Sequence, residues 1–305
     1  MTRVIDAQAA SRPVLLDGGM GRELRTRGVA VPDTIWSAAA LITDPDVVRK
    51  IHEDYIEAGA DVITTNTYGL IRSDLAKDGI EDRFADLNRL ACRLAEEARS
   101  RTDRHVAVAG SLPPLRGSFR PDRVGPSDLL QSLYREQIEL LAPHVDLLLC
   151  ETMSSAAEAR AAATAACATG KPVWVAFTLH EDRSGRLRSS ESLSEAFESL
   201  SGLPISGFLA NCCAPESISA AMGPLAGTGV PWFGGYANTF EPIPEDWVLD
   251  GDRETDGVLP LRDDLDPEAY ADHVRRWLAK GATVVGGCCG TGPAHIDRLR
   301  RLIDG

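Results

Sequence analysis

Eight short, apolar, β-rich runs recur along the whole chain and constrain its fold more than any other feature. The segments between the runs are longer, and several carry helical periodicity. Strands that alternate with helices form parallel sheets, because a parallel connection has to cross back over the sheet. The runs are "PVLLD" (13–17), "DVITTN" (61–66), "HVAVAG" (105–110), "DLLLCE" (146–151), "PVWVAFT" (172–178), "GFLANC" (207–212), "PWFGGYA" (231–237) and "TVVGGC" (283–288).

Two of the intervening segments are typical of amphipathic helices that lead into a strand. Residues 43–59 start with a cap-like Thr43 or Asp44 and an early Pro45, repeat apolar residues at helical spacing, and end at Gly59. Residues 266–281 repeat this design before the last run. The echo is a weak internal repeat of a strand and helix unit.

Eight such units in 305 residues predict a single-domain α/β fold, a (β/α)8 (TIM) barrel that spans residues 1–305. The alternative is a doubly wound sheet, but no Gly-x-Gly-x-x-Gly follows the first run as a dinucleotide site would require. Two proline-rich stretches, 111–127 and 238–264, follow strand ends. In a barrel we expect them to be loops around the active-site mouth.

Charge and composition exclude several classes of partner. The formal net charge of −13 argues against nucleic acid and anionic membrane surfaces. The amino-terminal segment lacks the apolar stretch of a secretory signal, and no uncharged run is long enough to cross a bilayer. We therefore expect a cytoplasmic protein that acts on small molecules. In that reducing compartment its 7 cysteines are expected to bind metal or to react, not to form disulfides.

Two adjacent cysteines at the end of the last run are the strongest chemical signal. Cys288 and Cys289 lie among glycines, which let the backbone leave strand geometry so that both thiols can turn inward. A third sulfur from "LANCC" would complete three ligands for a borderline ion such as zinc and leave a fourth position open. Spacing does not choose between Cys212 and Cys213. The alternative is that these are small buried residues.

Polar residues at other strand ends complete a candidate site. Asp17 and Glu151 end the first and fourth runs, where they could hold an ammonium group or act as general acid and base. Asp17 could instead cap the following helix. Asn66 and Asn238 could orient substrate or could be turn residues.

The motifs, taken in order, resemble those of the homocysteine S-methyltransferase family of zinc barrels, over about residues 14–296. Asn-Cys followed about 75 residues later by Gly-Gly-Cys-Cys-Gly is the most specific of them. They are "LLDGGMGREL", "TTNTYG", "CETMSS", "ANCCAPE", "YAN" and "GGCCGTGPAHI".

The resemblance implies a role for each candidate. It implies that Cys212, Cys288 and Cys289 bind zinc, and that Cys213 is the spare. It implies that Asp17 and Glu151 bind the amino group of the acceptor, with the backbone amides of Gly18 and Gly19 as candidates for its carboxylate. Asn66, Asn211 and Asn238 match family positions around the site.

The resemblance also implies the reaction, methyl transfer from a small onium donor to the thiolate of homocysteine, which gives methionine. A chain of 305 residues leaves no room for a cobalamin or folate module after the barrel, so we expect a free donor. Glu151 is followed by Thr152, whereas the betaine-using branch resembles Glu-Tyr at these two positions. The difference favours a sulfonium donor such as S-methylmethionine or S-adenosylmethionine. The strand-three loop departs from the family's Gly-Pro-Tyr-Gly pattern. The alternatives are a betaine-type donor, another thiol or selenol acceptor, or a non-catalytic barrel that stores zinc or senses oxidants.

Overall fold

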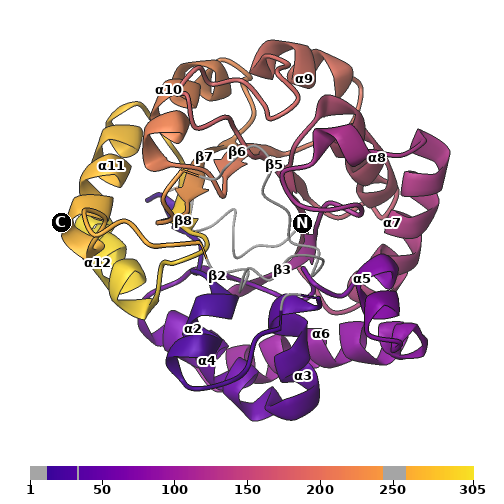
Figure 1. The fold of residues 1–305 in the computed structure, drawn as a ribbon. Coiled ribbons are helices and arrows are strands. Elements are labelled where there is room, and N and C mark those ends of the chain that lie inside the picture. The colour runs from indigo at the N-terminus through magenta and orange to yellow at the C-terminus, as the bar shows by residue number, and fades with distance from the viewer. Residues whose placement is uncertain (1–11, 33, 243–258) are drawn as a thin grey trace.

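The computed structural model of the chain is a barrel of eight parallel strands ringed by helices (Figure 1). It describes residues 12–32, 34–242 and 259–305. Each strand lies within one of the eight runs or overlaps it, so the predicted (β/α)8 barrel is confirmed. The strands are β1 (Val14–Leu15), β2 (Val62–Thr64), β3 (Ala107–Leu112), β4 (Leu147–Met153), β5 (Val173–Phe177), β6 (Gly207–Asn211), β7 (Trp232–Ala237) and β8 (Val284–Gly287).

The helices surround the sheet and supply the connections between consecutive strands (Figure 1). Both helices expected from sequence form, and the second buries Tyr270, Val274 and Trp277 in the core. No helix of the described residues is long and apolar enough to cross a membrane. The helices and helical turns are α2 (Met20–Thr26), η1 (Trp36–Ala39), α3 (Ala40–Thr43), α4 (Pro45–Glu57), α5 (Arg72–Lys77), η2 (Glu81–Arg83), α6 (Phe84–Ser100), η3 (Pro121–Arg123), α7 (Ser127–Leu141), α8 (Ala156–Cys167), α9 (Leu193–Ser199), α10 (Pro215–Ala226), α11 (Pro267–Ala279) and α12 (Pro293–Asp304).

Side chains fill the inside of the barrel, so the carboxyl end of the strands is the place left for a site. Val14 and Leu16 point inward and belong to an interior cluster, in which Trp174 and Trp232 lie with ring centroids 5.7 Å apart. Leu15, between them in sequence, belongs to the larger layer of apolar residues between the sheet and the helices. The alternation follows from the two-residue period of a strand.

The barrel closes through a weak seam between β1 and β2. The two strands share one isolated bridge, Leu16 with Val62, whereas every other neighbouring pair forms a parallel ladder of at least two residue pairs. Carboxylates strengthen the seam at both ends. At the carboxyl end, Asp17 accepts the backbone N–H of Thr64 at 2.7 Å. At the amino end, Asp61 accepts the backbone N–H of Leu15 at 3.0 Å.

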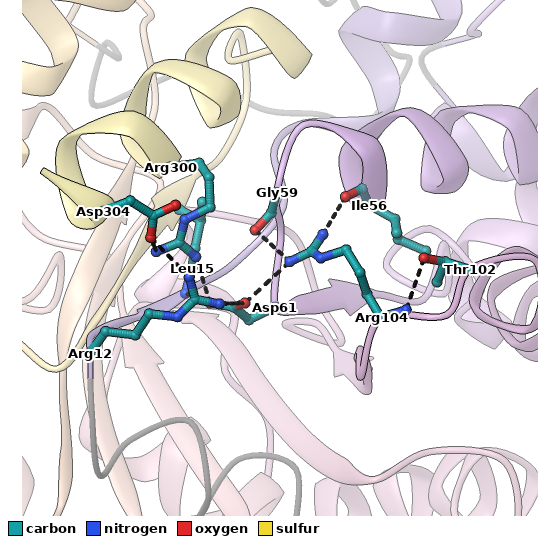
Figure 2. Close-up of polar contacts among 9 residues, drawn as sticks. All are labelled: Arg12, Leu15, Ile56, Gly59, Asp61, Thr102, Arg104, Arg300 and Asp304. Atoms are coloured by element: carbon teal, nitrogen blue, oxygen red, sulfur yellow. Dashed lines mark hydrogen bonds and ion pairs between the residues drawn. The ribbon is translucent and has the colours of Figure 1, made fainter.

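Asp61 is fully buried and lies among three arginines from distant parts of the chain (Figure 2). Arg12 and Arg300 each approach one of its oxygens to 3.1 Å, and Arg104 approaches to 3.4 Å. Arg104 also donates to the carbonyl oxygen of Gly59 at 3.1 Å. The cluster therefore ties the segment before β1, the start of β2, the segment before β3 and helix α12 together.

We expect Asp61→Asn to lower the free energy of unfolding by about 2–4 kcal/mol, because it leaves three guanidinium groups without their buried anion. Asp304→Asn is the matched control. Asp304 pairs with Arg12 and Arg300, but its side chain is 51% exposed, so the loss should stay below about 1 kcal/mol. Urea unfolding of both variants measures the difference, and equal losses would contradict the role given to Asp61.

Candidate functional site

The carboxyl ends of the strands surround a cavity of about 130 Å³, called the mouth below. It is lined by the carboxylates Asp17 and Glu151, by three thiols and by aromatic side chains from the loops. A larger cavity of about 530 Å³ lies between α5, α7 and the loop after β3. Four of its charged residues pair with one another, Arg72 with Glu136 and Lys77 with Asp74. The mouth, which gathers the chemically distinctive groups, is the candidate site.

The structure brings Cys212, Cys288 and Cys289 together. Their three sulfur atoms all lie within 4.8 Å of one another, and the Sγ atoms of Cys212 and Cys289 are 3.7 Å apart. Cys213 is fully buried and does not belong to this group. The geometry therefore distinguishes Cys212 from Cys213, a choice that sequence spacing alone did not make.

The backbone around the thiols is held outside strand geometry. β8 ends at Gly287, and the turn after it carries both cysteines, with Gly290 at a φ of 84°. A Cβ on Gly19 would lie 2.8 Å from the carbonyl oxygen of Cys288. Gly290 supplies a left-handed turn directly after the two cysteines, and both thiols reach the mouth. Because the turn packs closely on residue 19, no side chain fits there.

The thiols of the cluster differ in pKa. Hydrogen bonds from Cys212 and Cys288, opposed by burial, hold the pKa of Cys289 well below its usual range. Contacts with Cys212 and then Cys289, together with burial, raise the pKa of Cys288 well above its usual range. A cation bound among the three sulfur atoms would favour the thiolate form of each, because metal ligation requires a deprotonated thiol.

Asp17 lies at the edge of the mouth and does not cap a helix. The N-cap of α2 is Gly19, without any side-chain cap, so the capping alternative for Asp17 is wrong. The carboxylate accepts from the N–H and the hydroxyl of Thr64, at 2.7 and 3.0 Å. Burial still raises the pKa of Asp17 to about 7, against the lowering effect of these two bonds.

Glu151 lies across the mouth from β1, at the end of β4. Ser111 and Tyr236 each donate a hydroxyl to it, at 2.5 and 3.1 Å. Burial raises its pKa to about 7 although both hydrogen bonds lower it. Among the described residues, neither carboxylate forms an ion pair with a cationic side chain, so the mouth offers two carboxylates to a positively charged ligand.

The three asparagines take different positions. Asn66 lines the mouth, but its amide is bonded to Ser37, with the side-chain oxygen accepting from the hydroxyl at 2.5 Å. Asn211 is fully buried and holds the N–H and the hydroxyl of Thr152, both at 2.9 Å. Asn238 is 1% exposed and accepts from the backbone of Phe240 at 3.3 Å. Neither Asn211 nor Asn238 lines the mouth.

The two glycines after β1 differ in what their amides can do. Both line the mouth. The N–H of Gly19 donates to the carbonyl oxygen of Thr291 at 3.1 Å. The N–H of Gly18 donates to no other residue in the described ranges, so it is the better placed of the two to meet a ligand.

Sequence reasoning missed several residues of the mouth. Ser111 and Tyr236 hold Glu151, while Trp36, Tyr68 and Phe119 line the opening. The two-residue period of β7 was a usable signal, because Trp232 and Tyr236 share the inward face. Nothing local in the sequence marks the loop residues, whose positions depend on contacts between distant segments.

Comparison with known proteins places the chain in a family. The family model described as homocysteine S-methyltransferase matches residues 14–303. A curated homocysteine S-methyltransferase of Escherichia coli K12 is 30% identical over 308 residues, which covers 94% of each chain. The chain belongs to the homocysteine S-methyltransferase family.

Solved and plant relatives agree with this membership. The metallated crystal form of the homocysteine methyltransferase MmuM from Escherichia coli matches with a TM-score of 0.82 and 29% identity, over 98% of this chain and 99% of that one. A selenocysteine methyltransferase of Astragalus bisulcatus is 27% identical, over 96% of this chain and 93% of its own length. As a member of the homocysteine S-methyltransferase family, the chain is a methyltransferase, and the family supports homocysteine as the methyl acceptor.

The raised pKa of Glu151 predicts a pH dependence of stability. Burial moves this pKa from 4.5 to about 7, so between these values the folded protein keeps a proton that the unfolded chain has lost. That proton stabilises the folded state at low pH, and its contribution is lost as the pH rises through 7. Glu151→Gln removes this loss.

Urea unfolding from pH 4.5 to 8, with a chelator present, measures the effect. Relative to Glu151→Gln, the unsubstituted protein should become less stable with rising pH, by on the order of 2–3 kcal/mol in total. Parallel stability curves for the two proteins would show that Glu151 titrates normally.

Proposed function

We propose that this family member transfers a methyl group from a small sulfonium donor to homocysteine in a zinc-dependent reaction, which gives methionine. The observation that carries the proposal is the position of three thiols beside two buried carboxylates in one mouth. A thiol acceptor with an ammonium group needs both of these features. Among the described residues that line the mouth, these are the only carboxylates and thiols.

The cysteine cluster fits a zinc ion. Sulfur ligands about 2.3 Å from one tetrahedral ion lie about 3.8 Å apart, and the sulfur atoms of Cys212 and Cys289 are 3.7 Å apart. Three thiolates leave one position of a tetrahedron for a fourth ligand. A bound zinc ion would supply Lewis acidity there and lower the pKa of the acceptor thiol.

The protein's own residues would hold the acceptor. We assign Asp17 and Glu151 to its ammonium group, because an adjacent cation favours the ionised form of both buried carboxyls. The amide of Gly18, with Gly19 beside it, would meet the acceptor's carboxylate. Ser111 and Tyr236 fix the two oxygens of Glu151, so this side chain is oriented before the acceptor arrives.

Methyl transfer needs alignment more than acid or base catalysis. The acceptor sulfur has to attack the methyl carbon in line with the bond to the leaving sulfur, and holding both reactants in that geometry supplies much of the rate enhancement. We assign a positioning role to the asparagines. Asn66 holds Ser37, Asn211 holds Thr152 and Asn238 holds the start of the loop after β7.

The mouth favours a small donor. Its volume of about 130 Å³ is below the usual range of ligand pockets. Its loop-borne lining includes the aromatic residues Trp36, Tyr68 and Phe119, and ring faces attract onium cations. Thr152 follows Glu151, so a sulfonium such as S-methylmethionine is our first choice, ahead of S-adenosylmethionine and a betaine.

A selenol acceptor is the second candidate, because a relative covering 96% of this chain is a selenocysteine methyltransferase. Zinc storage or oxidant sensing is disfavoured, since neither explains the two carboxylates. All 7 cysteines are free thiols, which suits a role in cytoplasmic methionine synthesis.

Metal analysis tests the ligand set. Cys212→Ala, Cys288→Ala and Cys289→Ala should each lose most of the zinc bound by the unsubstituted protein, together with turnover. Cys213→Ala is the matched control and should keep stoichiometric zinc. Zinc content by mass spectrometry of the purified proteins distinguishes the four, and a zinc-free Cys213→Ala with a loaded Cys212→Ala would reverse the assignment.

A donor and acceptor panel tests the reaction. With homocysteine, S-methylmethionine should support turnover more efficiently than betaine. Glu151→Gln should raise the KM for homocysteine about 10- to 100-fold through loss of a charge-assisted contact, while bound zinc is unchanged. Zinc at full occupancy without turnover from any donor would favour storage, and an unchanged KM would remove the role given to Glu151.

A further inference from the structure

The backbone around the mouth is unusually strained. Six non-glycine residues of the described chain have positive φ, and four of them line the mouth, namely Trp36, Phe119, Thr152 and Cys212. Left-handed backbone is costly for a bulky residue and persists where the surroundings enforce it, often at functional sites. Two of the four are large aromatic residues, Trp36 at the start of η1 and Phe119 on the loop after β3.

Each of these two aromatic residues is backed by an arginine. The guanidinium carbon of Arg188 lies 5.0 Å from the ring centroid of Phe119, and that of Arg25 lies 5.5 Å from the ring of Trp36. Phe119 comes from the loop after β3 and Arg188 from the loop after β5. The contact therefore joins two separate loops above the barrel.

Arg188 is itself held firmly. Its side chain is only 5% exposed, and it pairs with Glu181 at 2.9 Å. The second oxygen of Glu181 accepts the backbone N–H of Ala214 at 3.0 Å. Ala214 follows Cys212 and Cys213, so a continuous line of contacts runs from the cysteines that follow β6 through Glu181 and Arg188 to the ring of Phe119.

The residues at the strand ends and the residues on the loops line different parts of the mouth, and we relate the first to the acceptor and the second to the donor. Asp17, Glu151 and Cys212 lie at or next to the ends of strands, at the floor of the mouth, where the acceptor is assigned. Phe119 lines the mouth from the loop beyond the end of β3. A donor that reaches the acceptor sulfur from the loop side of the mouth would meet this ring.

We propose that Phe119 selects the methyl donor and that Arg188 is its positioning residue, acting through the ring and not on the donor directly. This inference rests on the proposed function. The ring offers an onium group an aromatic surface, and the buried pair of Arg188 and Glu181 fixes where that surface stands relative to the cysteine loop. The class of ligand is a small compound with a methylated sulfonium or ammonium centre.

Steady-state kinetics on the zinc-loaded protein, with S-methylmethionine and homocysteine, test the proposal. Phe119→Leu should raise the KM for the donor about tenfold, while the KM for homocysteine and the zinc content stay within about twofold. Phe119→Tyr keeps the ring and should restore the donor KM. An unchanged donor KM in Phe119→Leu overturns the proposal.

The positioning role is tested by a double-substitution cycle. Arg188→Met should raise the donor KM about fivefold, and Phe119→Leu with Arg188→Met should be no worse than Phe119→Leu alone. Fold increases that multiply to about 50 would show that Arg188 acts independently. Arg183→Met removes the same charge from an exposed residue of the same loop and should change nothing.

Two further results separate the possible failures. Arg188→Met leaves the carboxylate of Glu181 without its partner, which can destabilise the fold. The double variant Arg188→Met with Glu181→Gln removes both charges and should have the same donor KM as Arg188→Met alone. No turnover by the unsubstituted protein with any donor would refute the proposed function and this inference together. Turnover with normal donor kinetics in every variant would refute this inference alone.

Discussion

The register of β6 and β8 on the β7 strand between them is the constraint on which the site depends. Tyr236 of β7 lies opposite Asn211 of β6 and also opposite Gly286 of β8. Cys212 then donates its backbone N–H to Tyr236, and Cys288 donates its own to Ala237. Two residues 76 positions apart are thus brought to the same level, and a slip of one residue in either ladder would turn a thiol away.

Asp17 links the stability of the barrel to its chemistry. The same carboxylate that faces the mouth closes the seam between β1 and β2 through Thr64, where the strands share only one bridge. Buried carboxyls that lack a cation are costly to ionise, and the raised pKa values of Asp17 and Glu151 express that cost. An ammonium ligand would offset this cost, so the buried carboxyls would favour a cationic acceptor.

Sequence alone predicted the barrel and the chemistry of its floor, because both have local signals. Strand runs, helix stops and glycines beside Cys288 and Cys289 are all readable from neighbours in the chain. The choice of Cys212 over Cys213 came from family resemblance, and the structure supports it by placing one sulfur in the cluster and the other in the core. The alternative that Asp17 caps a helix is wrong, because its carboxylate accepts hydrogen bonds from Thr64 of β2. The arginines around Asp61 were missed because residues 12, 104 and 300 share no local pattern.

The loops are where prediction from sequence ends, because their positions depend on contacts between distant segments. Asn211 accepts a hydrogen bond from the backbone N–H of Thr152 on β4, and Glu181 accepts one from the backbone N–H of Ala214 after β6. Both contacts begin next to Cys212 and extend outward, one to the strand end that carries Glu151 and the other to Phe119 at the opening. In-line transfer requires the acceptor sulfur, the methyl carbon and the leaving group to stay aligned within a few tenths of an ångström. Under the proposed function, a cysteine loop that contacts both walls of the mouth would serve this requirement, because it connects the strand that carries the residue assigned to the acceptor with the ring assigned to the donor.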